Sequence, residues 1–126
     1  MRILTAIMFT DIEGFTSLMQ RDEAKAIRLL ERHKKIFLQY TEQHKGRVIK
    51  YIGDGTLTIF NSVFDAISCA VAMQQAFQKN PVIPVRIGIH TGEVLFEKKD
   101  VIGDAVNLAS RIQTKGIAGS VLVSEK

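Results

Sequence analysis

The sequence feature that most constrains the fold is a nearly continuous apolar run close to the N-terminus, at residues 3–9. This run is too short to span a membrane, and its branched and aromatic residues are typical of a β-strand buried on both faces. A strand without a polar face can carry chemistry only at its end. Asp11 and Glu13 lie directly after the run, and Gly14 allows the backbone to turn sharply or to approach a ligand closely.

A second acidic turn contains Asp54, which stands between two glycines. Strand-like segments at residues 47–52 and 56–60 flank this turn, and Asp-Gly between such segments is a strong hairpin signal. If the hairpin lies beside the first strand, Asp54 and Asp11 meet.

Two carboxylates that converge from separate elements suit Mg²⁺, which is usually shared between one or two carboxylates and the phosphates of a substrate. Two such ions could activate an attacking oxygen and stabilise a leaving one. A purely structural interpretation stays open at this point, in which Asp11 caps a turn or helix and Asp54 only fills a hairpin turn.

The remaining apolar periodicity predicts three helices and two further strands. The expected elements are a helix at residues 21–44, a helix between Ser62 and Pro81, a strand at 85–90, a helix at 104–113 and a strand at 121–123. Clean alternation predicts one buried face for the strand at 85–90. Residues 93–99 are expected to form a short excursion into solvent. The apolar residues expected to pack the last helix are Ala105, Leu108, Ala109 and Ile112.

This order of elements predicts an α+β fold with a ferredoxin-like split βαβ core, in which an antiparallel sheet carries helices on one face. An additional C-terminal helix and strand follow the core. We expect Cys69 to be a core thiol. We also expect His33 and His44 to be surface or helix-end residues, and His90 to be a structural hydrogen-bonding residue.

Composition narrows the class of protein further. The chain has 126 residues, of which 46% are hydrophobic and 24% charged, as in ordinary soluble domains, so we expect one domain and a cytoplasmic location. We expect no direct membrane segment, because no long apolar stretch occurs. The formal net charge of +4 permits anionic partners. The basic clusters lack interleaved aromatic residues, so nucleic acid is not an expected partner.

Polar residues on and near the last predicted helix form a further group. Asn107 and Arg111 are four residues apart, so they project from one side of that helix. Arginine supplies a fixed fork of donors to phosphate, and asparagine can orient a sugar. Lys50 precedes Asp54 by four residues, and Asp100 precedes Asn107 by seven. Taken singly, each of these residues would be ordinary surface.

Together, these residues and the two acidic turns match a pattern, and the segments around them resemble the catalytic domain of class III nucleotidyl cyclases of the adenylate cyclase type. The segments are residues 9–16, 50–55, 86–92 and 103–111. The resemblance covers residues 1–126 in the expected order. The family continues past the position of Lys126 into further strands that carry a triphosphate-binding lysine, so we expect the chain to be truncated at its C-terminus.

The resemblance implies a homodimer with shared active sites, in which the metal-binding residues of one subunit face the base- and transition-state-binding residues of the other. Asp11 and Asp54, with the backbone carbonyl of Ile12, would bind two Mg²⁺ or Mn²⁺ ions. Lys50 and Asp100 match the pair that selects the purine, and their donor and acceptor pattern suits adenine.

On the same resemblance, Asn107 orients the ribose and Arg111 stabilises charge on the α-phosphate. The implied reaction converts ATP to 3′,5′-cyclic AMP and pyrophosphate, in a parent protein that carries additional regulatory domains. Three alternatives stay open: a cyclase for another nucleoside triphosphate, a catalytically silent nucleotide-binding or dimerising regulatory module, and a nucleic-acid-binding domain of the same fold. The last would need exposed aromatic residues on the sheet, and the strands lack that pattern.

Overall fold

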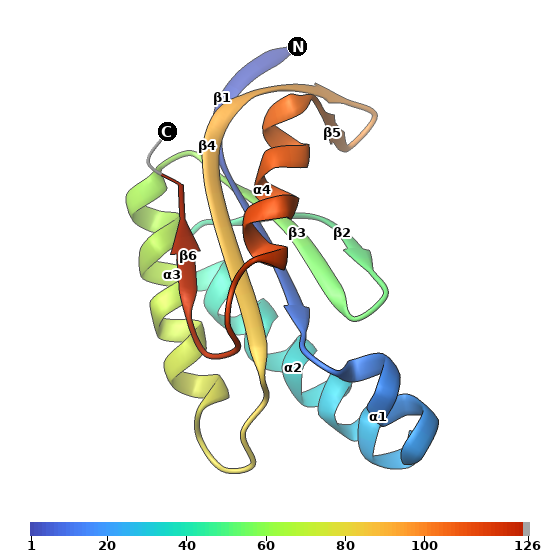
Figure 1. The fold of residues 1–126 in the computed structure, drawn as a ribbon. Helices are drawn as coiled ribbons and strands as arrows, with labels where there is room; N and C mark the ends of the chain where they lie inside the picture. The colour runs from blue at the N-terminus through green and yellow to red at the C-terminus, as the bar shows by residue number, and fades with distance from the viewer. Residues whose placement is uncertain (125–126) are drawn as a thin grey trace.

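The computed structural model describes residues 1–124, which form one six-stranded sheet and four helices (Figure 1). The predicted α+β class is confirmed. In chain order the elements are β1 (Arg2–Ile12), α1 (Phe15–Arg21), α2 (Glu23–Gln43), β2 (Arg47–Ile52), β3 (Gly55–Phe60), α3 (Val63–Phe77), β4 (Val85–Glu97), β5 (Asp100–Ile102), α4 (Asp104–Thr114) and β6 (Val121–Val123).

The sheet has the strand order β2-β3-β1-β4-β5, and β6 pairs in parallel with the first half of β4. All other pairs are antiparallel. β1 lies in the middle and pairs with β4 from Arg2 opposite Leu95 to Ile12 opposite Val85. Its residues 5–10 are all buried, so the expected strand with two buried faces is confirmed.

Helices cover both faces of this sheet (Figure 1). On one face, α2 and α3 pack on Met8 and Phe60 through core residues such as Phe37 and Phe77. On the other, α4 packs on residues such as Ile7, Phe9 and Leu57. The helices of the ferredoxin-like core therefore share one face, as predicted, and the additional helix covers the other.

The expectation of a single buried face for the strand at residues 85–90 was wrong, because α4 covers its second face. Gly88 and Gly92 allow this helix to pack closely. A Cβ atom on Gly88 would lie 2.3 Å from the backbone nitrogen of Gln113, and one on Gly92 would lie 2.6 Å from the Cβ of Ala105. The expected excursion at residues 93–99 is instead the second half of β4 and its hairpin to β5.

Two expectations about helices need correction. A short separate helix, α1, precedes α2, and Asp22 between them caps α2 by accepting a hydrogen bond from the backbone N–H of Lys25 at 3.2 Å. In α4, Ala105 and Ala109 are buried as predicted. Leu108 is 41% exposed and Ile112 is only partly buried, whereas Gln113, which was not predicted, is buried. The buried side of α4 therefore follows a four-residue spacing from Ala105 to Gln113.

The histidines divide between predictions that hold and one that fails. His44 ends α2, and the Nδ1 atom of His90 hydrogen-bonds the hydroxyl of Ser124, as expected for a helix-end and a structural residue. His33 was wrongly expected at the surface: it is 2% exposed and stacks on Phe77, with ring centroids 5.2 Å apart. Its charged sequence neighbours point elsewhere because successive helical residues are rotated by about 100°.

Burial changes the acid–base chemistry of two core residues. Loss of solvation lowers the pKa of His33 to about 4, so this imidazole is neutral at physiological pH. Cys69 is fully buried, which confirms the core thiol, and burial raises its pKa to about 12.

Among the described residues, no helix has the length and apolar character needed to cross a membrane.

Candidate active site

Two acidic turns meet at the end of the central strand. β3 runs antiparallel to β1 with Thr10 opposite Thr56, so the β2–β3 turn that carries Asp54 lies beside the end of β1. The backbone N–H of Ile12 donates a hydrogen bond to Oδ2 of Asp54 at 2.8 Å. The hairpin thus lies beside the first strand as the sequence suggested, and Asp11 and Asp54 line one pocket.

Buried polar contacts fix this junction. The hydroxyl groups of Thr10 and Thr56 hydrogen-bond at 2.6 Å between the two strands. Gly55 is required beside them, because a Cβ atom there would lie 2.6 Å from the carbonyl oxygen of Thr10. Sequence reasoning did not identify the threonine pair, whose only signal is that Thr10 directly precedes one acidic residue and Thr56 follows the other by two positions.

Arg86 is a site residue whose role sequence reasoning missed. It stands opposite Asp11 in the β1–β4 ladder and forms a two-pronged ion pair, with Nε–Oδ1 at 2.9 Å and Nη2–Oδ2 at 2.6 Å. Hydrogen bonding to Asp11 raises the pKa of the guanidinium, and the charges of Asp11, Glu13 and Asp54 add to the effect. Asp11, Glu13 and Asp54 therefore form an acidic cluster at the end of β1, and this cluster already attracts the cation of Arg86. The sequence signal for this role is that Arg86 is the one charged residue in the otherwise apolar stretch at residues 85–89.

The pocket at this junction has a volume of about 180 Å³ and is bounded by β1, the β2–β3 hairpin and α4. Its polar lining includes the carboxylates of Asp11 and Asp54, and Ser110 and Gln113 contribute from α4. Within residues 1–124, no three His, Cys, Asp or Glu side chains are grouped to hold a metal ion. Two carboxylates with a nearby backbone carbonyl at Ile12 nevertheless fit Mg²⁺ or Mn²⁺, because Mg²⁺ takes its remaining ligands from water and phosphate.

Lys50 and Asp100 lie in direct contact. The Nζ atom of Lys50 on β2 is 3.1 Å from Oδ2 of Asp100 on β5, although these strands are at opposite ends of the strand order. A second contact spans the same gap, where the guanidinium of Arg47 lies 4.3 Å from the ring centre of Phe96. The sheet is therefore curled enough for its first and last strands to meet over the face that α4 covers.

Further contacts fix the carboxylate of Asp100 and keep it charged, while the pair stays accessible to a ligand. Oδ1 of Asp100 accepts the backbone N–H of Val101 at 2.7 Å. This bond, followed by the one from Lys50, lowers the pKa of Asp100 and keeps it ionised. Both side chains are nearly half exposed, at 46% and 43%, so a ligand can reach them. The result is one cationic donor and one anionic acceptor side by side at the surface.

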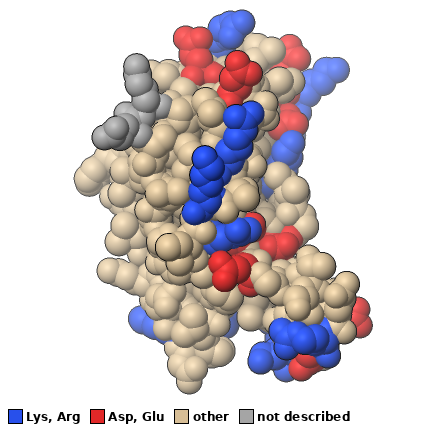
Figure 2. Space-filling model, in the orientation of Figure 1, with Lys and Arg blue, Asp and Glu red and all other residues tan. Residues whose placement is uncertain are grey.

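Asn107 and Arg111 lie on the exposed side of α4. They do not line the pocket at Asp11 and Asp54, to which α4 contributes Ser110 and Gln113 instead. Figure 2 shows a band of basic side chains across the face that α4 occupies, with acidic side chains near both ends of the band. One chain thus does not bring all the predicted site residues into one cavity.

Comparison with known proteins gives consistent matches. The family model for the adenylate and guanylate cyclase catalytic domain matches residues 4–126. The putative adenylate cyclase 3 of Rhizobium meliloti (strain 1021) is 37% identical over 132 residues, covering 98% of this chain and 22% of that protein.

Solved structures agree in fold. The crystal structure of an adenylate/guanylate cyclase/hydrolase from Silicibacter pomeroyi is 33% identical with a TM-score of 0.84, covering 99% of this chain and 77% of that one. The crystal structure of the guanylyl cyclase Cya2 is 26% identical with a TM-score of 0.86, covering 98% and 76%. Similar structures therefore include proteins named for either purine.

The chain spans only 22%, 15% and 29% of the length of three of its curated relatives. Within that span the agreement is nearly complete, because the family model begins at residue 4 and the Silicibacter pomeroyi structure matches the same sheet and helices. The chain therefore belongs to the family of adenylate and guanylate cyclase catalytic domains.

Proposed function

We propose that this domain converts ATP to 3′,5′-cyclic AMP and pyrophosphate at active sites shared by two copies of the chain. The observation that carries the choice of ATP is the contact between Lys50 and Asp100 at 3.1 Å. The name of the Rhizobium meliloti relative points the same way.

The contact favours adenine because of its donor and acceptor pattern. The ammonium group of Lys50 donates to an acceptor nitrogen of the ring, and the carboxylate of Asp100 accepts from the exocyclic amine. Guanine presents a carbonyl oxygen and a ring N–H where adenine presents the amine and the ring acceptor. The same pair would then leave polar groups unpaired beneath the bound base, which is a strong basis for discrimination.

Asp11 and Asp54, with the carbonyl of Ile12, would hold two divalent cations. When bound, these ions neutralise phosphate oxygens and make the ribose 3′-hydroxyl a better nucleophile. Within the chain, the carboxylate of Asp11 must first lose its ion pair with Arg86. That guanidinium, which also donates to the carbonyl oxygen of Thr114 at 3.2 Å, then offers its charge to the anionic substrate.

Asn107 and Arg111 would act on the site of a second copy, since their exposed side of α4 is free for such a contact. Asn107 orients the ribose, and Arg111 stabilises the charge that develops on the α-phosphate. The 3′-oxygen forms a bond to the α-phosphorus while the bond to the β-phosphate oxygen breaks. Pyrophosphate leaves and the hydroxyl proton passes to water, so no protein nucleophile is required.

A substrate panel tests this proposal. The protein is incubated with ATP, GTP, CTP or UTP and with Mg²⁺ or Mn²⁺, and the products are identified by mass spectrometry. We expect cyclic AMP from ATP alone, its loss in Asp54→Asn, and its retention in Asp22→Asn. The control removes one exposed carboxylate from a helix cap, where asparagine serves equally well.

Other outcomes would select the alternatives. A different cyclic nucleotide would retain the cyclase chemistry but overturn the roles given to Lys50 and Asp100. Normal nucleotide binding without any product, in a protein shown to be dimeric, would favour a regulatory module. The chain spans only part of the length of its relatives, so we also propose that the parent protein carries regulatory domains.

A further inference from the structure

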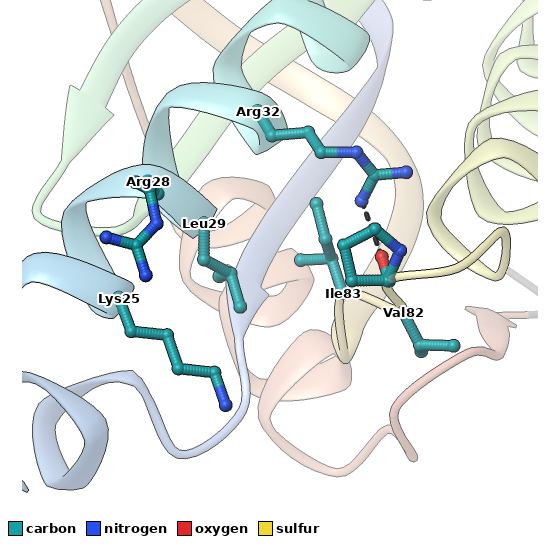
Figure 3. A pocket seen from close by; sticks show the side chains of 7 residues that line it. Lys25, Arg28, Leu29, Arg32, Val82 and Ile83 are labelled. Carbon is teal, nitrogen blue, oxygen red and sulfur yellow. Dashed lines mark hydrogen bonds between the residues drawn. The ribbon is translucent and has the colours of Figure 1, made fainter. Parts of the chain in front are cut away.

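A second cavity lies between α2 and the loop that precedes β4 (Figure 3). Its volume is about 320 Å³, and none of its lining residues belongs to the pocket at Asp11 and Asp54. The size falls at the lower end of the range of cavities that bind small molecules, roughly 300–1,000 Å³. This cavity has no role in the proposed cyclase reaction.

The floor of the cavity is apolar. Leu29 contributes from α2, and Val82 and Ile83 contribute from the loop. Ile83 is buried in the core, whereas Val82 is 50% exposed and offers apolar surface to a ligand. Burying such surface is favourable, by roughly 25 cal/mol for each Å² removed from water.

Three cations surround this floor. Lys25, Arg28 and Arg32 lie at spacings of three and four residues along α2, so they project from the same side of the helix (Figure 3). Among residues 1–124, no Asp or Glu oxygen lies within 4.0 Å of the side-chain nitrogens of these three residues. The three cations around the cavity therefore form no ion pair within the described chain.

Arg32 differs from the other two because it is fixed. Its Nη1 donates to the carbonyl oxygen of Pro81 at 2.6 Å (Figure 3). Its Nη2 donates to the carbonyl oxygen of Lys79 at 3.3 Å. These bonds tie the loop to α2. The side chains of Lys25 and Arg28 make no hydrogen bond to any other described residue, so their donors are available.

We propose that this cavity binds a small amphipathic anion. Lys25 and Arg28 hold its carboxylate or phosphate group, and a short apolar chain packs on Leu29, Val82 and Ile83. A purely inorganic anion would leave the floor exposed to water, and a neutral apolar molecule would leave the cations without a partner. Both parts of the ligand are therefore needed for tight binding.

The cavity also borders the segment that carries Asp11. The residue after its loop, Pro84, accepts a hydrogen bond from the backbone N–H of Glu13 at 2.8 Å. A ligand on this loop is thus close in structure to the acidic cluster. The binding proposal does not depend on cyclase activity, and its test uses binding alone.

The test measures four probes by calorimetric titration: octanoate, octyl phosphate, 1-octanol and inorganic phosphate. We expect saturable binding of at least one of the two amphipathic anions, and the better of them identifies the preferred head group. Octanol and inorganic phosphate should each bind at least about tenfold more weakly, since each lacks one of the two contributions. Amide chemical-shift changes in the unsubstituted protein should centre on residues 25–32 and 81–83.

Matched variants locate the site. The double variant Lys25→Gln with Arg28→Gln should weaken binding of the anion at least about tenfold, because it removes both free donors. The double variant Arg2→Gln with Lys35→Gln makes the same change in net charge at exposed positions outside the cavity and should bind normally. Val82→Ser should weaken the amphipathic anions and leave inorganic phosphate unchanged.

Several results would overturn the proposal. These are no binding of either amphipathic anion, equal affinity for octanol and octanoate, equal weakening in both double variants, or chemical-shift changes centred away from the cavity. The last measurement uses the unsubstituted protein, so it remains decisive even where a variant fails to fold.

Discussion

His33 makes the stability of the domain depend on pH in a window that the structure defines. The imidazole is buried and its Nε2 has no hydrogen-bond partner among residues 1–124, so burial lowers its pKa from 6.5 to about 4. The unfolded chain therefore binds a proton below about pH 6.5 that the folded chain does not bind until about pH 4. The free energy of unfolding must fall as the pH falls through this window. Between pH 7.5 and pH 5 the linkage relation gives a loss of about 2 kcal/mol.

The assay is urea unfolding followed by circular dichroism at pH 7.5, 6.5, 5.5 and 5. The comparison is between the unsubstituted domain and His33→Phe, which keeps an aromatic ring beside Phe37 and Phe77 and removes the titration. Other groups titrate equally in both proteins, so the difference between the two pH profiles isolates His33. We expect that difference to grow by about 2 kcal/mol down to pH 5. Parallel profiles would refute the reasoning, because His33 would then have similar pKa values in the folded and unfolded states.

Three further predictions follow from buried or paired groups. Thr10→Val leaves the hydroxyl of Thr56 without its 2.6 Å partner and should cost about 1–3 kcal/mol in urea unfolding, whereas an unchanged midpoint would contradict the contact. Cys69, buried with a pKa of about 12, should react with a thiol reagent at pH 8 only after unfolding, and rapid reaction in the native protein would contradict its burial. Arg86→Gln removes the cation that pairs with Asp11 and should tighten Mn²⁺ binding about three- to tenfold in a calorimetric titration, whereas unchanged affinity would show that the ion pair does not compete.

Local sequence signals were sufficient to predict most elements of the fold. The apolar run of β1, the β2–β3 hairpin and the start of α3 after Ser62 each depend on neighbouring residues, and all three lie where the sequence placed them. The errors concern tertiary contacts. The second buried face of β4 depends on α4, which follows it in the chain, and the burial of His33 depends on Phe77 from another helix.

The candidate site divides in the same way. The meeting of Asp11 and Asp54 could be predicted because each follows a strand signal and the two strands pair. The ion pair of Arg86 with Asp11 depends on the exact register of β1 and β4, which no local pattern determines. The contact between Lys50 and Asp100 depends on the curl of the whole sheet, and only the family resemblance identified this pair.

A mixing experiment tests the central claim, that two copies share each active site, most directly. Asp54→Ala removes a metal-binding carboxylate, and Arg111→Ala removes the cation that the partner would supply. We expect each variant alone to make no cyclic AMP. After co-expression, half of randomly paired dimers are mixed and each mixed dimer has one intact site of two, so activity should recover to about a quarter of the unsubstituted level. No recovery, with both variants folded and dimeric, would contradict the shared site, as would full activity in either variant alone.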